Sequence, residues 1–386
     1  MAVRNLTYKL TFIYLFFSVF EFYINATIGN VTRFFMLFYC LVCFFETLSS
    51  GKLRKVSYCQ FSVLLWLVYS LITICWSTNI TQVKVYIFTF VTMSFLWFCV
   101  LANDYTHDQI DSLLSFFQVC SLVLCILGLF FSAPLLEDGT NNIRYVLYIN
   151  GSRADPNYLL ALYVINVQIG LYRLLNYEKN RIFNIVSVLL GCVAILYTGS
   201  RSGILILGVS FLVIGWNKLK NISFAKKIGL LVGVIIGLVV LYYIASRFIP
   251  EATLNRVLGI GDLKYTNSTG RIESWTRRFE AWKGFNNIFF GMGFGSNTAH
   301  STLLSFILEF GILGFSLYLY PVCCVLIQNI KTKNSLAIAL MLGGLIQAFM
   351  CPATNMRFFW NAMIIPSLLI NKMSNSVNDT DNSTGV

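Results

Sequence analysis

The chain has 386 residues, of which 57% are hydrophobic and 11% are charged, and its formal net charge is +12. Its mean hydropathy is +0.72, and apolar runs close to the thickness of a bilayer recur along it, which excludes a soluble globular protein. The positive charge does not indicate nucleic-acid binding, because no basic block adjoins a soluble domain.

The apolar runs predict an all-α polytopic membrane protein with about twelve transmembrane helices. The predicted spans are residues 10–28, 32–48, 58–76, 84–102, 110–132, 157–175, 182–198, 202–216, 228–246, 302–328, 335–350 and 358–371. The two runs that flank Thr198 to Ser202 are short for a full crossing, so we expect a kinked or re-entrant helix there. Residues 1–373 are expected to form one transmembrane domain, followed by a polar, disordered tail at 374–386.

Lysines and arginines in the short loops predict the orientation. With a cytoplasmic N-terminus, most of these residues, such as Lys52, Arg54 and Lys55, fall on the inner side. Both termini would then be cytoplasmic, and the inner basic rim would contact membrane lipids with anionic head groups. The long loops at about 133–156 and 247–301 would face outward, which for a bacterial inner membrane is the periplasm.

The smaller outer loop ends in Arg153-Ala154-Asp155-Pro156-Asn157, where the chain re-enters the membrane. Asp155 is suited to cap the following helix and Pro156 to occupy its first turn. Capping does not account for Arg153, which is therefore a candidate binding residue.

A second arginine, Arg201, lies in the turn Gly199-Ser200-Arg201-Ser202-Gly203 between two spans. The turn is not a nucleophile elbow, because arginine occupies the position where a serine is required. An arginine in hydrocarbon costs about 3 kcal/mol at a helix centre and usually faces a polar cavity or a partner. The alternative is that Arg201 reaches the lipid head groups from an interfacial position.

The large outer loop contains a predicted amphipathic helix at residues 270–284. Ile272, Trp275, Phe279 and Trp282 recur at three- and four-residue steps and form one apolar stripe. Arg271 and Arg278 are seven residues apart and share a face, so both are candidates for binding an anion. A helix that only anchors the loop at the membrane surface would show the same pattern.

A glycine-rich run, Gly291-Met292-Gly293-Phe294-Gly295, precedes His300 and the next long apolar helix. It is neither a P-loop nor a dinucleotide fingerprint. Glycines allow close approach of the backbone, and unpaired N–H groups at a helix start favour phosphate oxygens. Glu309 falls on the opposite side of a continuous helix from His300, so we expect it to serve in packing.

Outward arginines, one outward histidine and aromatic side chains suit a sugar carried on a lipid diphosphate. Arginine binds two phosphate oxygens at once, imidazole is a general base at neutral pH, and aromatic rings cover sugar rings. The two histidines, His107 and His300, have no carboxylate cluster beside them. The sequence therefore predicts neither a metal site nor a cofactor.

The order of these motifs, with Glu309-Phe310-Gly311 and Gly314 after His300, resembles the bacterial O-antigen polymerase and ligase superfamily over roughly residues 150–320. The resemblance implies a membrane glycosyltransferase of the GT-C type. It implies that Arg153, Arg201, Arg271 and Arg278 contact the undecaprenyl diphosphate or the glycan, and that Trp275 and Trp282 contact the substrate. His300 would be the catalytic base.

Within that superfamily, the sequence favours a Wzy-type polymerase that joins undecaprenyl-diphosphate-linked repeat units, with a chain-length regulator as a partner by analogy. His300 is followed by Ser301, where members of this superfamily often have asparagine, and no second histidine lies nearby. These two departures weaken a ligase-like assignment more than a polymerase one. The alternatives are an O-antigen ligase, which transfers glycan to lipid A core, and a lipid-linked oligosaccharide flippase. A flippase would be expected to show an internal repeat, which the sequence lacks.

Overall fold

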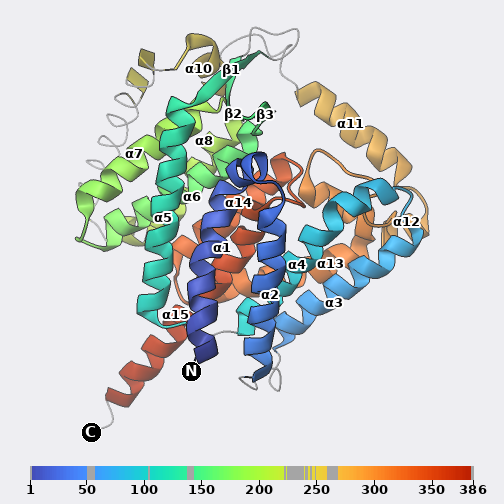
Figure 1. The fold of residues 1–386 in the computed structure, drawn as a ribbon, viewed down its shortest axis with the longest axis horizontal. Coiled ribbons are helices and arrows are strands. Elements are labelled where there is room, and N and C mark those ends of the chain that lie inside the picture. The colour runs from blue at the N-terminus through green and yellow to red at the C-terminus, as the bar shows by residue number, and fades with distance from the viewer. Residues whose placement is uncertain are drawn as a thin grey trace. The chain divides into compact units, whose positions relative to one another are not determined.

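The chain is almost entirely helical in its computed structural model (Figure 1), which describes residues 2–49, 57–102, 105–136, 143–220, 249–258 and 268–383 and isolated positions between 223 and 247. Internal contacts divide it into two compact units. Unit 1 comprises Met1–Ser18, Gly29–Leu113 and Asn267–Val386, and unit 2 comprises Val19–Ile28 and Leu114–Thr266. The single transmembrane domain expected over residues 1–373 stays a prediction.

Unit 1 is built from both ends of the chain. Its elements are α1 (Ala2–Thr27) as far as Ser18, α2 (Val31–Ser49), α3 (Tyr58–Ile72), the short 3₁₀ helix η2 (Thr73–Trp76), α4 (Ile80–Ala102), the start of α5 (His107–Phe130), α11 (Ser268–Ala281), α12 (Phe285–Phe290), α13 (Thr302–Lys331), α14 (Ser335–Met350) and α15 (Arg357–Ser383). In Figure 1, α11 lies at the end of this unit opposite to the start of α1.

An aromatic cluster forms the core of unit 1. Trp66 of α3 and Phe90 of α4 lie 4.9 Å apart between ring centroids, and Phe90 lies 4.9 Å from Phe294 of the glycine run. Trp360 of α15 joins them at 5.7 Å from Phe90. Each such pair contributes about 0.5–1.5 kcal/mol beyond the burial of its surface. The cluster therefore holds the glycine run against the transmembrane helices.

Helix α13 is interrupted at Gly311, whose φ of 66° and ψ of −173° lie outside the helical region. A break frees carbonyl groups of the preceding turn. The carbonyls of Leu308 and Glu309 accept hydrogen bonds from the N–H groups of Met292 at 3.0 Å and Gly293 at 2.9 Å. The break in α13 and the glycine run are thus parts of one packing arrangement.

Gly291 should be intolerant of any side chain. Its φ is +83°, and an added Cβ would overlap the carbonyl oxygen of Glu309. We expect Gly291→Ala to lower the free energy of unfolding by about 2 kcal/mol or more, measured as a lower melting temperature of the purified protein in detergent. Gly208→Ala is the control, because its Cβ would meet nothing within 4 Å. Equal stability of the two variants would contradict the arrangement.

Unit 2 is centred on α6 (Pro156–Asn176), which packs on α7 (Arg181–Tyr197) and α8 (Arg201–Leu219). The end of α1, most of α5 and α10 (Glu251–Leu258) complete its helices. The predicted start of α6 is confirmed: Pro156 occupies its first turn, and Asp155 accepts a hydrogen bond from the N–H of Asn157 at 2.7 Å.

The loop expected at about residues 133–156 forms a sheet, which the sequence did not predict. Strands β1 (Ser132–Leu136), β2 (Ile143–Ile149) and β3 (Ser152–Arg153) pair antiparallel in that order. Asn150 and Gly151 connect β2 to β3 with positive φ angles, as a tight hairpin requires. The prediction of an all-α fold is therefore wrong for this loop. The sequence did not reveal the strands, because strands this short give little periodicity.

Among the described residues, seven helices are long and apolar enough to cross a membrane. They are Leu6–Thr27, Val31–Ser49, Tyr58–Trp76, Ile80–Leu101, His107–Phe130, Pro156–Asn176 and Thr302–Lys331. Four predicted spans are shorter apolar helices, at Arg181–Tyr197, Arg201–Trp216, Ser335–Met350 and Arg357–Ile370. The remaining span, 228–246, lies almost wholly outside the described residues, so a total of twelve stays a prediction. Helix α15 continues to Ser383, into the segment predicted to be disordered.

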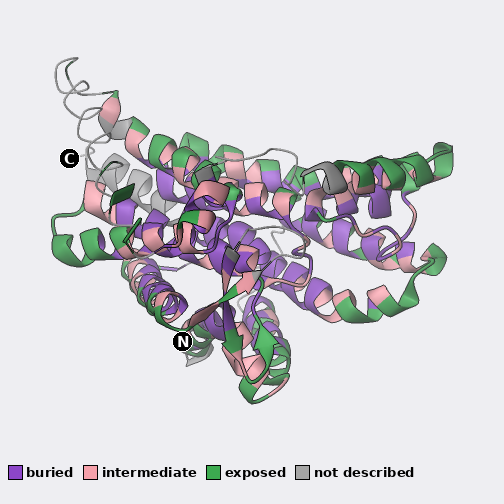
Figure 2. Cartoon of the chain, turned by 90° about the horizontal axis from the view of Figure 1, so that it is seen from above, coloured by how far each residue is buried: buried purple, intermediate pink, exposed green. Residues whose placement is uncertain are grey.

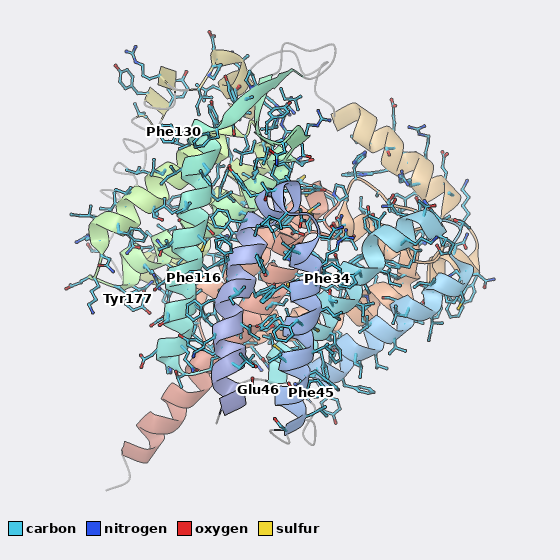
Figure 3. The ribbon with its side chains drawn as sticks, in the orientation of Figure 1. Phe34, Phe45, Glu46, Phe116, Phe130 and Tyr177 are labelled. Atoms are coloured by element: carbon cyan, nitrogen blue, oxygen red, sulfur yellow. The ribbon has the colours of Figure 1, made fainter. Side chains whose placement is uncertain are left out.

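Apolar side chains cover the outward faces of the helices. Figure 2 shows exposed residues along outer helix faces and buried ones toward the inside. Phe34 and Phe45 on α2 and Phe130 at the end of α5, which Figure 3 labels, are 74%, 62% and 77% exposed. Large aromatic residues at such exposure are costly in water and favourable in lipid, which agrees with a polytopic membrane protein.

Candidate functional site

The turn between α7 and α8 is a buried, hydrogen-bonded polar feature of unit 2. Gly199 has a φ of +66°, which allows the chain to reverse, and Thr198 and Ser200 beside it are buried. The hydroxyl of Ser200 donates to the side-chain oxygen of Asn157 at 3.0 Å and lies 2.9 Å from the hydroxyl of Ser202. These bonds attach the turn to the start of α6.

Two arginines that the sequence reading missed hold this turn. Arg144 of β2 donates from Nε to the carbonyl of Thr198 at 3.3 Å and from Nη2 to Asn157 at 3.1 Å. Arg256 of α10 donates from Nε to the carbonyl of Gly199 at 3.1 Å. The stems of both arginines lie about a van der Waals distance from the place where a Cβ of Gly199 would be. A larger residue at this position would press on both stems.

Arg201, the first residue of α8, is exposed and donates from Nε to the carbonyl of Arg256 at 3.2 Å. We refer to Arg144, Arg201 and Arg256 as the arginine cluster. Three elements, β2, α8 and α10, bring these residues together, and Figure 1 shows α10 near β2 and α8. Three arginines bonded around one turn concentrate positive charge there, which favours an anion such as a phosphate.

Arg153 is exposed on β3, where it pairs with Tyr148 of β2. In the described part of the chain, no hydrogen bond joins it to the arginine cluster. Arg153 and Arg201 both belong to unit 2. Of these two side chains, that of Arg201 is held by a hydrogen bond, to the carbonyl of Arg256.

In unit 1 the glycine run does not offer its amides to a ligand, and this corrects the expectation of a phosphate cradle. Met292 and Gly293 bond to α13, and the N–H of Phe294 donates to the hydroxyl of Thr73 at 3.2 Å. The indole of Trp76 donates to the carbonyl of Gly291 at 3.1 Å. The glycines serve close packing, because the run and the broken helix approach each other backbone to backbone.

N–H groups at the start of α13 also have hydrogen-bond acceptors within the protein. Ser301 caps it by accepting from the N–H of Leu304 at 3.3 Å, and the N–H of Thr302 donates to the carbonyl of Cys351 at 3.2 Å. His300 lies just before this cap with an exposed side chain, between the buried residues Ala299 and Ser301. The structure thus fixes the backbone around His300 and leaves its imidazole accessible.

The predicted amphipathic helix is confirmed as α11. Arg278 on it donates from Nη1 to the side-chain oxygen of Asn297 at 2.9 Å, and the Asn297 amide donates back to the carbonyl of Arg278 at 3.2 Å. Arg271 is also on α11, but its side chain lies outside the described residues. Arg278 and Arg271 belong to unit 1, whereas Arg153 and Arg201 belong to unit 2.

The two tryptophans expected to contact substrate pack against other aromatic rings of unit 1. Trp275 lies 5.7 Å from Phe349 of α14, and Trp282, which lies just past the end of α11, meets Phe279 edge to face at 5.9 Å. Ile272, Trp275 and Phe279 line one side of an open, mainly apolar hollow of about 420 Å³. This hollow fits the interfacial role of the helix as well as contact with a ligand.

Comparison with known proteins shows a similarity to one family over about a third of the chain. Residues 186–319 match the O-antigen ligase family. This match confirms the resemblance to the O-antigen polymerase and ligase superfamily, whose members are glycosyltransferase-like enzymes. The region that matches the O-antigen ligase family contains Arg201, Arg256, Arg278 and His300, and it ends within α13.

Other comparisons are more distant. No curated protein matches the chain. Among solved structures, a chain from work on the structural coordination of polymerization and crosslinking by a peptidoglycan synthase complex is similar, with 13% identity and a TM-score of 0.45. The similarity covers 83% of this chain and 98% of that chain.

Proposed function

We propose that this protein is an O-antigen polymerase, which transfers a growing glycan from one lipid diphosphate to the terminal sugar of another lipid-linked repeat unit. The arginine cluster around the Thr198–Ser202 turn carries the proposal. It gathers positive charge within and beside the region that matches the O-antigen ligase family, where a leaving diphosphate needs compensation.

The chemistry needs a base for the acceptor hydroxyl and positive charge for the departing diphosphate. The acceptor hydroxyl oxygen attacks the anomeric carbon of the donor, and the bond from that carbon to the diphosphate oxygen breaks. The bonding electrons leave with the diphosphate, whose charge is stabilised by arginine side chains, Arg201 first among them. The hydroxyl proton passes to His300, whose exposed imidazole makes it available as the general base.

The finer features of the proposal come from the family resemblance. The lipid would be undecaprenyl diphosphate, the fold GT-C-like, the reaction independent of a metal, and the location the bacterial inner membrane with both termini cytoplasmic. Figure 1 supports the orientation, since α11 and the start of α1 lie at opposite ends of unit 1. Arg153, Arg271 and Arg278 would add contacts to the diphosphate or glycan, and a chain-length regulator would be a partner.

An O-antigen ligase is the second candidate, because the matching family model carries that description. It would use the same donor and the same leaving group, so the arginine cluster would serve it equally. The two differ in the acceptor, which is a lipid-linked repeat unit for a polymerase and lipid A core for a ligase.

Deletion of the gene in its native host separates the two candidates. For a polymerase, we expect the lipopolysaccharide to run on a gel as core capped with one repeat unit, without the ladder, and plasmid complementation to restore the ladder. Bare core, together with long glycan still attached to the lipid carrier, would identify a ligase instead. An unchanged ladder would refute both.

A further inference from the structure

The side chain of Asn157 contacts the arginine cluster, and the proposed reaction gives it no role. Asn157 is the second residue of α6. Its side-chain oxygen accepts one hydrogen bond from Nη2 of Arg144 at 3.1 Å and another from the hydroxyl of Ser200 at 3.0 Å. A single carboxamide oxygen thus joins the start of α6 both to strand β2 and to the Thr198–Ser202 turn.

Capping of α6 does not use this side chain. Asp155 is the N-cap, and its exposed carboxylate accepts from the backbone N–H of Asn157 at 2.7 Å. Any residue except proline at position 157 supplies that N–H. The carboxamide of Asn157 therefore has a separate task, which is to bind Arg144 and Ser200.

Helix stability alone would favour an acid at position 157. The first turn of a helix carries partial positive charge, so a carboxylate there stabilises the helix by about 0.3–1 kcal/mol. A carboxylate also bonds to a guanidinium more strongly than a neutral amide does. Asparagine provides neither contribution. It binds Arg144 through a neutral oxygen and brings no negative charge to the arginine cluster.

Three further hydrogen bonds of the cluster go to backbone carbonyls, which are also uncharged. Nε of Arg144 donates to Thr198, Nε of Arg256 donates to Gly199, and Nε of Arg201 donates to Arg256. Arg144 is only 9% exposed. A buried guanidinium needs acceptors for its N–H groups, and neutral acceptors satisfy these groups without cancelling the positive charge.

We propose that Asn157 is a positioning residue of the arginine cluster, whose neutral oxygen fixes the Arg144 guanidinium and the Ser200 hydroxyl without reducing the positive charge that binds the donor diphosphate. The diphosphate as ligand rests on the proposed function. Asn157 acts through Arg144 and does not touch the donor. Stability and diphosphate binding should therefore respond differently to one substitution, Asn157→Asp.

Asn157→Asp separates this role from a purely structural one. The aspartate keeps the acceptor oxygen and adds a negative charge beside Arg144. We expect the purified full-length protein to melt at the wild-type temperature or above it, and to bind undecaprenyl diphosphate at least about tenfold more weakly, measured by microscale thermophoresis in detergent. A purely structural acceptor predicts unchanged binding. Wild-type affinity in Asn157→Asp would overturn the proposal, as would a melting temperature below that of wild type.

Asn176→Asp is the matched control for added charge. Asn176 is exposed at the other end of α6, and the helical rise of about 1.5 Å per residue places it on the order of 28 Å from Asn157. Salt screens charges beyond about 10 Å at 0.1 M ionic strength. We expect Asn176→Asp to bind undecaprenyl diphosphate within about twofold of wild type. Equal losses in the two variants would show a general effect of charge and would overturn the role of Asn157.

A double variant tests whether Asn157 acts through Arg144. Asn157→Ala and Arg144→Gln should each weaken the binding of undecaprenyl diphosphate, and the double variant should bind within about twofold of Arg144→Gln, because both changes remove one interaction. Effects that multiply would contradict an action through Arg144. Should Asn157→Ala not fold, Asn157→Asp still decides the proposal, since it keeps the acceptor oxygen.

Glycan transfer from the lipid-linked donor tests the link to the proposed function. We expect Asn157→Asp to lower kcat/KM for the donor at least about tenfold, in line with its weaker binding. If the wild-type protein binds undecaprenyl diphosphate but transfers no glycan, the proposed function fails, while the binding comparison still decides the role of Asn157. If the wild-type protein does not bind undecaprenyl diphosphate, this inference is overturned.

Discussion

Replacing His300 with alanine should abolish glycan transfer without unfolding the protein. The imidazole is exposed, so its removal leaves no cavity, and the bonds that anchor this segment belong to its neighbours Ser301 and Thr302. Removal of a general base lowers kcat by about 10²- to 10⁴-fold. The measurement is transfer from purified lipid-linked donor in proteoliposomes, with the melting temperature of each variant recorded.

His107→Ala is the matched control, because His107 is the other histidine of the chain and starts α5 on the predicted inner side. We expect it to retain transfer within about threefold of wild type, as substitutions away from the reacting groups usually do. If His300→Ala transfers glycan at the wild-type rate, His300 is not the base.

Arg201→Gln should lower kcat/KM for the donor by about 10- to 150-fold, the value expected for loss of a hydrogen bond to a charged group worth about 1.5–3 kcal/mol. Arg201 is exposed, and its Nε is fixed by the carbonyl of Arg256. Its remaining donors can therefore meet a diphosphate without reorganisation. Arg201→Lys should recover only part of the activity, because lysine restores the charge but not the planar pair of donors.

Arg181→Gln provides the control for charge. Arg181 is exposed at the start of α7, and Arg201 follows the end of the same helix. Both substitutions remove one positive charge, so a general electrostatic effect on anionic lipid would reduce activity equally in both. A loss confined to Arg201→Gln would support donor binding, whereas equal losses would refute a specific role for Arg201.

Local features of the site could be predicted from the sequence. Asp155 and Pro156 begin α6 as expected, and Gly199 turns the chain with a positive φ. In these cases the physical cause lies within a few residues: a side chain bonds to its own helix start, or a glycine allows a backbone conformation that other residues avoid. Contacts of side chains with residues far along the chain had no comparable local cause in the sequence.

The glycine run illustrates the limit. Its position before a helix start suggested a phosphate site, but its amides bond to α13 and to Thr73, which are distant in sequence. Arg144 and Arg256 were missed for the same reason, since they approach the turn from β2 and α10. The sequence around an arginine in a long loop shows no periodic pattern that would reveal which residue the arginine contacts.

The sequence by itself determined that this is a membrane protein with apolar helices, because a bilayer demands long runs of apolar residues whatever their packing. It also indicated the superfamily that the chain resembles, because the motifs follow one another in the order typical of that superfamily and residues 186–319 match the O-antigen ligase family. Only the tertiary structure decided which polar groups form hydrogen bonds within the protein and which remain accessible to a ligand. That distinction depends on hydrogen bonds between residues far apart in sequence, such as the one from Arg256 to the carbonyl of Gly199, and such a bond forms only once the chain has folded.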